Sequence, residues 1–150
     1  MVDLGAGNQK LNRYLPATCG YYPVDCVAQF PETHIADFNK DFTLPDVSNP
    51  IFVCAGLLEY VVDWGKFFST LRKHAPGATV IASYHLRDNS SRQEMLTCNN
   101  FTDVDEVLSE LAKHMRFLLF WFDRVKRLSI RNTPTRAKRE RYNHGLGFQP

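Results

Sequence analysis

Short apolar segments alternate with glycine- or proline-containing turns along this chain, and this alternation limits the folds that it can adopt. Residues 1–4, 20–25, 33–37 and 51–55 are the first four such segments. The fourth is apolar throughout, which is typical of a central strand in a parallel sheet. A helical pattern and then a further strand follow it, so the sequence predicts an α/β fold with right-handed crossovers.

Two stretches have the apolar periodicity of amphipathic helices. In the first, apolar residues recur at i, i+3, i+4 and i+7, Asp63 is placed to cap the N-terminus, and Pro76-Gly77 ends the helix. In the second, Thr102 opens a helix with acidic residues in its first turn. The stripes are Trp64, Phe67, Phe68 and Leu71, and then Val104, Val107, Leu108 and Leu111. A fifth strand over residues 78–84 is predicted between the two helices.

Two crossover helices are predicted to be reduced to loops, because residues 26–32 and 38–49 are short or interrupted by proline. Near the C-terminus, the apolar run from Phe117 to Phe122 predicts a sixth strand. Residues 125–130 then predict a seventh, which returns beside the sixth as an antiparallel edge strand.

Composition is that of a globular protein, with 150 residues, 44% hydrophobic and 23% charged. We assign residues 1–131 to one domain and residues 132–150 to a flexible basic tail. No apolar run approaches the roughly 20 residues that span a bilayer, and the N-terminus lacks a basic segment followed by an apolar one. Four cysteines without a CxxC pair complete the prediction of a cytoplasmic protein with reduced thiols.

Basic residues are concentrated at the C-terminus. Residues 124–150 hold eight Lys and Arg against Glu140 alone, a net charge of +7, whereas the residues before them sum to −5. Such a segment attracts nucleic acid or an anionic membrane surface by charge, and an ordinary solvated tail has the same composition. Both interpretations stay open.

The first strand leads into the turn Gly5-Ala-Gly7, after which Leu11, Tyr14 and Leu15 recur at helical spacing. Glycines let the backbone adopt positive φ and approach a ligand closely, and the N-terminus of the following helix offers N–H groups to an anion such as a carboxylate. Asp3 adds a fixed negative charge. The dinucleotide-binding pattern G-x-G-x-x-G would place its third glycine at Lys10, so a ligand without phosphates fits better.

Two aspartates end neighbouring strands of the predicted sheet. In an open α/β sheet, ligands bind beyond the carboxyl ends of the strands, where the strand order reverses. Asp25 follows Gly7 by 18 residues, where its carboxylate can accept hydrogen bonds from both hydroxyls of a ribose. A solvated turn aspartate after Pro23 is the alternative. Asp37 has the same geometry toward an adenine edge.

Four segments in the same order resemble class I S-adenosylmethionine-dependent methyltransferases. They are Val2-Asp-Leu-Gly-Ala-Gly7, Tyr22-Pro-Val-Asp25, Ala36-Asp-Phe-Asn-Lys40 and Val53-Cys-Ala-Gly-Leu-Leu-Glu-Tyr-Val-Val-Asp63. The resemblance covers residues 1–86. Within the family, the chain looks especially like small methyltransferases of bacterial glycan or polysaccharide gene neighbourhoods. It implies a Rossmann-like, mostly parallel sheet with flanking helices, S-adenosylmethionine as cofactor, and a small molecule or glycan as methyl acceptor.

The resemblance also implies which residues hold the cofactor. They are Gly5 and Gly7 beside Asp3 at the methionine part, Asp25 at the ribose, Asp37 and Phe38 at the adenine, Ala55, Gly56 and Leu57 beneath the sulfonium, and Tyr60 packed on the cofactor. The sequence departs from the family at Gln9, a position often held by a third small residue. Its first strand begins at Met1, which is compatible with a fragment or with a short variant.

Methyl transfer from a sulfonium mostly requires a protein to hold donor and acceptor together and to exclude water, so a general base is optional. For a neutral hydroxyl acceptor, His85 after the fifth strand is the candidate catalytic base, because imidazole titrates near neutral pH. A plain loop histidine is the alternative. Glu59 follows the fourth strand and either borders the acceptor pocket or only caps a helix or forms an ion pair. The cysteines and histidines show no metal-ligand spacing, so no metal is predicted.

Three functions from different classes are left open. The leading one is an enzyme that methylates a small molecule or glycan. The second is a nucleic-acid methyltransferase whose basic tail binds phosphates, which predicts binding that weakens steeply with salt. The third is a non-catalytic Rossmann-like interaction domain that binds no cofactor, motivated by Gln9 and by the start at Met1.

Overall fold

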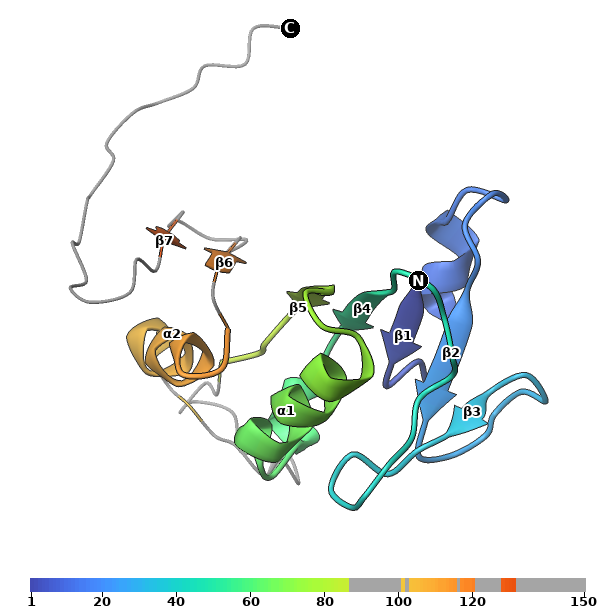
Figure 1. Ribbon diagram of the computed structural model, residues 1–150, viewed down its shortest axis with the longest axis horizontal. Helices are drawn as coiled ribbons and strands as arrows, with labels where there is room; N and C mark the ends of the chain where they lie inside the picture. The colour runs from blue at the N-terminus through green and yellow to red at the C-terminus, as the bar shows by residue number, and fades with distance from the viewer. Residues whose placement is uncertain (87–100, 102, 116, 121–127, 132–150) are drawn as a thin grey trace, which may run out of the picture.

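The computed structural model describes residues 1–86, 101, 103–115, 117–120 and 128–131. Within them, five parallel strands form one sheet in the order β3-β2-β1-β4-β5 (Figure 1). The strands are β1 (Val2–Leu4), β2 (Tyr22–Asp25), β3 (His34–Ile35), β4 (Ile51–Cys54) and β5 (Thr79–Ala82). The predicted α/β fold with a parallel sheet is confirmed. The strand order reverses at β1, since β2 lies on one side of it and β4 on the other.

One face of the sheet is covered by helix α1 (Trp64–His74). The helix buries Trp64, Phe67, Phe68 and Leu71, which are the four residues of the predicted stripe. The predicted cap is also present, because the Asp63 side chain accepts a hydrogen bond from the Lys66 N–H at 2.8 Å. Periodicity and capping therefore fix this helix together.

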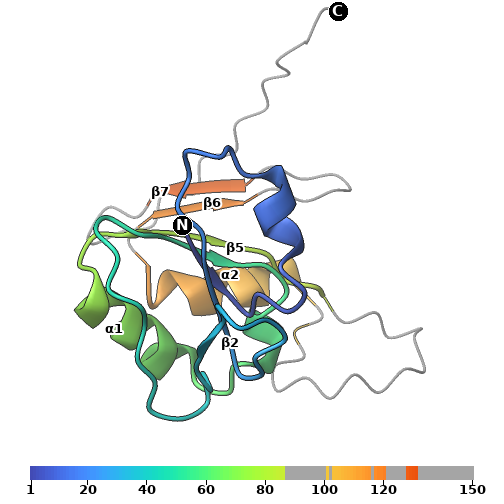
Figure 2. The same cartoon turned by 90° about the vertical axis from the view of Figure 1, so that its right-hand side faces the viewer.

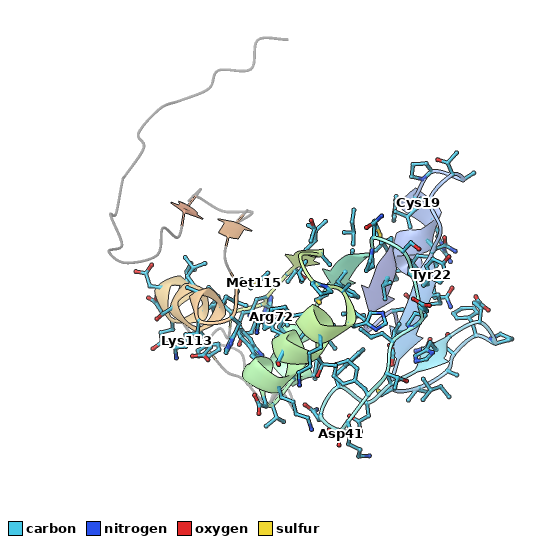
Figure 3. All side chains as sticks on the ribbon, viewed as in Figure 1. Cys19, Tyr22, Asp41, Arg72, Lys113 and Met115 are labelled. Atoms are coloured by element: carbon cyan, nitrogen blue, oxygen red, sulfur yellow. The ribbon has the colours of Figure 1, made fainter. Side chains whose placement is uncertain are left out.

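Helix α2 (Val104–Ala112) lies on the same side of the sheet as α1 (Figure 2). It buries Val107, Leu108 and Leu111 of its predicted stripe, and its cap is Asp103, whose side chain accepts from the Asp105 N–H. Near the C-terminal end of α2, Arg72 of α1 donates to the His114 carbonyl at 3.3 Å, beside Met115 in Figure 3. The two helices therefore form one layer.

The hydrophobic core fills the space between this layer and the sheet. Alternate residues of each strand point toward it, and on β4 these are Phe52 and Cys54, both fully buried. Aromatic rings from the loops complete the packing, as where Phe38 meets Phe67 edge to face with ring centroids 5.7 Å apart. The loop after β3 is thereby fixed to the core through Phe38.

The remaining strand residues face the opposite side of the sheet. Asp3, Val53 and Ile81 are paired in register across β1, β4 and β5. Their exposed fractions are 4%, 8% and 52%, so this face of the sheet is buried over β1 and β4 and exposed to solvent over β5. The buried part of this face contains an ionisable residue, Asp3.

Two connections differ from regular crossovers. The segment after the glycine turn was predicted to be an amphipathic helix, but it forms only a 3-10 helix, η1 (Lys10–Tyr14), that buries none of its residues. The chain leaves η1 as extended backbone at Leu15, directly before Pro16. Residues 26–32 and 38–49 contain no helix, as predicted.

Strands β6 (Phe117–Phe120) and β7 (Leu128–Arg131) pair antiparallel with each other, as predicted. They were also expected to extend the main sheet at its edge, but they form a separate two-stranded sheet, in which each satisfies the backbone hydrogen bonds of the other. Residues 121–122, the start of the predicted seventh strand at 125–127 and the tail 132–150 lie outside the described residues. In the described part, no helix is long and apolar enough to cross a membrane.

Candidate functional site

The glycine turn after β1 lies against the end of β2. The backbone N–H groups of Gly5 and Ala6 both donate to the Val24 carbonyl, at 2.8 and 3.1 Å. These two hydrogen bonds bring the loops that follow β1 and β2 together at the carboxyl edge of the sheet, where the strand order reverses. Open α/β sheets bind their ligands at this position.

Glycine is favoured at both ends of this turn. Gly5 and Gly7 have φ of 76° and 49°, which side-chain-bearing residues rarely adopt. A Cβ on Gly5 would also lie 3.1 Å from Leu57 Cδ1. The turn after β1 therefore packs closely against the turn after β4, and the positions expected to contact the methionine part and the sulfonium of a cofactor are adjacent.

Asp25 connects the glycine turn to the end of β2. Its Oδ2 accepts from the Gly7 N–H at 2.8 Å, and its Oδ1 accepts from the Val27 N–H at 3.2 Å. The Cys26 side chain also hydrogen-bonds to Asp25, so these three donors leave about one of the four lone-pair sites of the carboxylate for a further hydrogen bond. The structure thus brings Asp25 and Gly7 together, and the carboxylate keeps acceptor capacity for a hydroxyl group.

Asp3 lies beneath this site and is almost fully buried. Its Oδ2 accepts from the Tyr21 hydroxyl at 2.7 Å. Burial raises the pKa of Asp3, the Tyr21 hydrogen bond lowers it, and the negative charge of Asp25 raises it. Burial and the neighbouring Asp3 carboxylate raise the pKa of Tyr21 in turn. The charge of Asp25 at the end of β2 therefore acts on Asp3 in β1.

Gln9 occupies the position where the family often has a small residue. Its backbone has φ of 56°, a left-handed conformation that explains why a glycine would suit the position. The side chain is buried and its Nε2 donates to Thr33 Oγ1 at 3.3 Å. The glutamine thus connects the glycine turn to the loop that precedes β3.

Asp37 and Phe38 follow β3. The Asp37 carboxylate is exposed, accepts from the Asn39 N–H at 3.1 Å and pairs with Lys40 at 3.0 Å. The hydrogen bond from Lys40 is the main cause that lowers the pKa of Asp37. The Phe38 ring is buried in the core, so a ligand can reach this residue only through its main chain. Their contacts with an adenine stay predictions.

The turn after β4 contains the remaining expected cofactor positions. Ala55, Gly56 and Tyr60 are exposed and Leu57 is buried, with Tyr60 in the 3-10 helix η2 (Leu58–Tyr60). The Gly56 N–H donates to Ser83 Oγ at 2.9 Å, which ties the turn to the end of β5. These positions lie at one edge of the sheet with Gly5.

His85 lies just beyond β5 with an exposed side chain. Its backbone N–H donates to Glu59 Oε1 at 2.6 Å. The structure therefore brings the backbone of His85 to the turn after β4. The role of the imidazole as a base stays a prediction.

Three polar residues that organise this edge had no role in the sequence analysis. Tyr21 binds Asp3, Ser83 binds the Gly56 N–H, and Asn39 holds η2. The Asn39 side chain donates to the Tyr60 carbonyl at 2.9 Å and accepts from the Val62 N–H at 2.8 Å. Their only sequence signal is a polar residue next to a strand end, which is too common to identify them.

Comparison with known proteins identifies no family for this chain. No protein family model matches the chain, and no curated protein or solved structure matches it. Among the residues that the structure describes, no group of three or more His, Cys, Asp or Glu is arranged to hold a metal ion.

Proposed function

We propose that this chain is a Rossmann-like, S-adenosylmethionine-dependent methyltransferase domain whose acceptor is a small molecule or a glycan. The observation that carries the proposal is the junction of the glycine turn with Asp25, in which the Gly7 N–H binds Asp25 Oδ2 at 2.8 Å. This junction lies at the reversal of strand order, next to the turn after β4. The sequence resemblance assigns the cofactor to the same place.

The residues present fit an adenosyl ligand with a cationic centre. Gly5 and Gly7 leave backbone without side chains at the ligand side of the turn, and Asp25 retains acceptor capacity for a ribose hydroxyl. The charges of Asp3 and Asp25 favour a sulfonium and an ammonium, and they oppose the phosphates of a dinucleotide. This charge pattern supports the methyl donor over a nicotinamide cofactor.

S-adenosylmethionine would supply a methyl group on sulfur, which passes to a lone pair of the acceptor while the sulfur keeps the bonding electrons. The chain has to position that acceptor and exclude water. The turn after β4 is suited to this role, because Asn39 and Ser83 fix it to the ends of β3 and β5. A fixed turn can hold an acceptor in one orientation.

Calorimetric titration with S-adenosylhomocysteine tests the proposal. We expect the wild-type chain to bind, and Asp25→Ala to weaken the affinity by tenfold or more, since hydrogen bonds to a charged group contribute about 1.5–3 kcal/mol each. Asp46→Ala, which removes an exposed aspartate, is the matched control and should bind as wild type does. Absence of binding by the wild-type chain would favour the non-catalytic interaction domain.

A further inference from the structure

Glu59 is buried and only half satisfied. It lies in η2, directly after the turn that follows β4, and 5% of its surface is exposed. Oε1 accepts from the His85 N–H at 2.6 Å, whereas Oε2 is buried and has no hydrogen-bond partner among the described residues. One oxygen thus has a structural partner, and the other awaits a donor.

A purely structural role does not account for this arrangement. Accepting one backbone N–H needs a single neutral carbonyl oxygen, which a glutamine or asparagine supplies without a charge. A buried carboxylate oxygen without a donor is among the more unfavourable groups that a folded protein can hold. A ligand that brings an O–H or N–H group would remove the penalty.

The position of Glu59 indicates which ligand this is. Leu57, two residues earlier, packs against Gly5, and Gly56 is tied to Ser83 at the end of β5. The Glu59 carboxylate therefore lies between the carboxyl ends of β4 and β5, beside the expected sulfonium position and away from Asp25, which the ribose would use. A methyl acceptor has to lie on this side of the donor.

We propose that Glu59 Oε2 accepts a hydrogen bond from the methyl acceptor, and that this acceptor is a hydroxyl or amine compound without negative charge. The inference rests on the proposed methyltransferase function and narrows its substrate class.

Charge at the same edge supports the exclusion of anions. Asp3, Asp25 and Glu59 are acidic, and Lys40 in the loop after β3 is paired with Asp37. Like charges repel most strongly where water is excluded, so a phosphate group would be unfavourable next to Glu59. An amino sugar or another neutral or cationic compound fits, whereas a nucleic-acid acceptor would bring phosphates to this edge.

Ethanolamine serves as the probe, because it combines an ammonium and a hydroxyl, and phosphoethanolamine is its anionic counterpart. Each is titrated into the 150-residue chain with saturating S-adenosylhomocysteine, and the side-chain carboxyl carbons of ¹³C-labelled glutamate are followed by NMR. We expect ethanolamine to shift the Glu59 signal and phosphoethanolamine to leave it unchanged. This measurement uses the wild-type chain and depends on no variant.

Glu59→Gln supplies the second arm. It keeps an oxygen for the His85 N–H and replaces the other with an NH₂ group, so ethanolamine should bind about tenfold more weakly or worse. Glu106→Gln, an exposed glutamate in the first turn of α2, is the matched control and should bind ethanolamine as wild type does.

Equal ethanolamine binding by wild type and Glu59→Gln, no shift of the Glu59 signal, or equal binding of phosphoethanolamine would each overturn the inference. S-adenosylhomocysteine binding is read separately by calorimetry. If it binds and Glu59 does not respond, only the acceptor assignment fails. If it does not bind, the proposed function fails as well.

Discussion

On β1, Val2 and Leu4 face the helices, whereas Asp3 between them faces the other side of the sheet. The helix side is apolar and aromatic, and its residues on β1, β2 and β4 are fully buried. The other side combines a buried carboxylate over β1 with the exposed Ile81 over β5. Alternate residues of the same strands therefore build two surfaces of opposite chemistry.

This difference indicates where the chain gains stability and where it places its chemistry. Buried apolar groups without polar atoms stabilise the fold, and rings such as Phe38, Phe42 and Phe67 contact each other closely. Asp3 and Glu59 are buried despite their charge and oppose folding unless they are fully partnered. Buried charged residues that oppose folding near the carboxyl edge of the sheet are candidate functional residues.

The largest expected effect contrasts the two faces directly. Phe67→Ala removes a fully buried ring from the helix side and should lower the free energy of unfolding by about 3–5 kcal/mol. Ile81→Ala on the other face should lower it by about 1 kcal/mol or less, because half of that side chain is already exposed. Urea unfolding measures both. Similar losses would show that the faces do not differ in this way.

A smaller effect is expected at the start of α1. Asp63→Ala removes the side-chain acceptor of the Lys66 N–H and should lower the free energy of unfolding by about 1 kcal/mol. In the same urea series, exposed Asp46→Ala should stay within about 0.5 kcal/mol of wild type. If both variants behave alike, the cap does not anchor the helix layer.

The smallest effect is expected at Asp3, and it depends on pH. The folded-state pKa of Asp3 lies above its ordinary value of 3.8, so between these two pH values folding takes up a proton. The stability of the wild-type chain therefore falls as the pH rises from 3.8 through the folded-state pKa. Asp3→Asn keeps an oxygen for the Tyr21 hydroxyl and lacks the charge. We expect it to stabilise the ligand-free chain at neutral pH by about 1 kcal/mol or less.

Thermal unfolding at several pH values measures this gain. The stability advantage of Asp3→Asn should disappear below pH 3.8, where Asp3 is protonated in both the folded and the unfolded chain. An advantage that is constant with pH would mean that the Asp3 charge is not its cause. Tyr21→Phe complements the test, because it removes the hydroxyl that lowers the pKa of Asp3.

The sequence predicted those elements for which several local signals agree. Helix α1 has an apolar stripe, a capping aspartate and a proline-glycine end, and it forms as expected. The segment after the glycine turn has only two turns of apolar spacing, which cannot distinguish an α-helix from the 3-10 helix that forms. The pairing of β6 with β7 was predicted, but their separation from the main sheet depends on tertiary contacts that no local pattern encodes.

The candidate site was predictable where topology alone decides it. Successive parallel strands end at one edge, so Gly7 and Asp25 were expected at the same edge of the sheet, and the structure shows a hydrogen bond between them there. Contacts made by long side chains were not predictable, because they depend on rotamers and loop paths. The Tyr21 bond to Asp3 and the unpartnered oxygen of Glu59 belong to this group.

A single amide couples two loops at this edge. Asn39, in the loop after β3, engages the carbonyl of Tyr60 and the N–H of Val62, so the segment after η2 is fastened at two points to a different part of the chain. The two loops must therefore shift together when either one moves. A molecule that binds the loop after β3 would therefore also restrain η2.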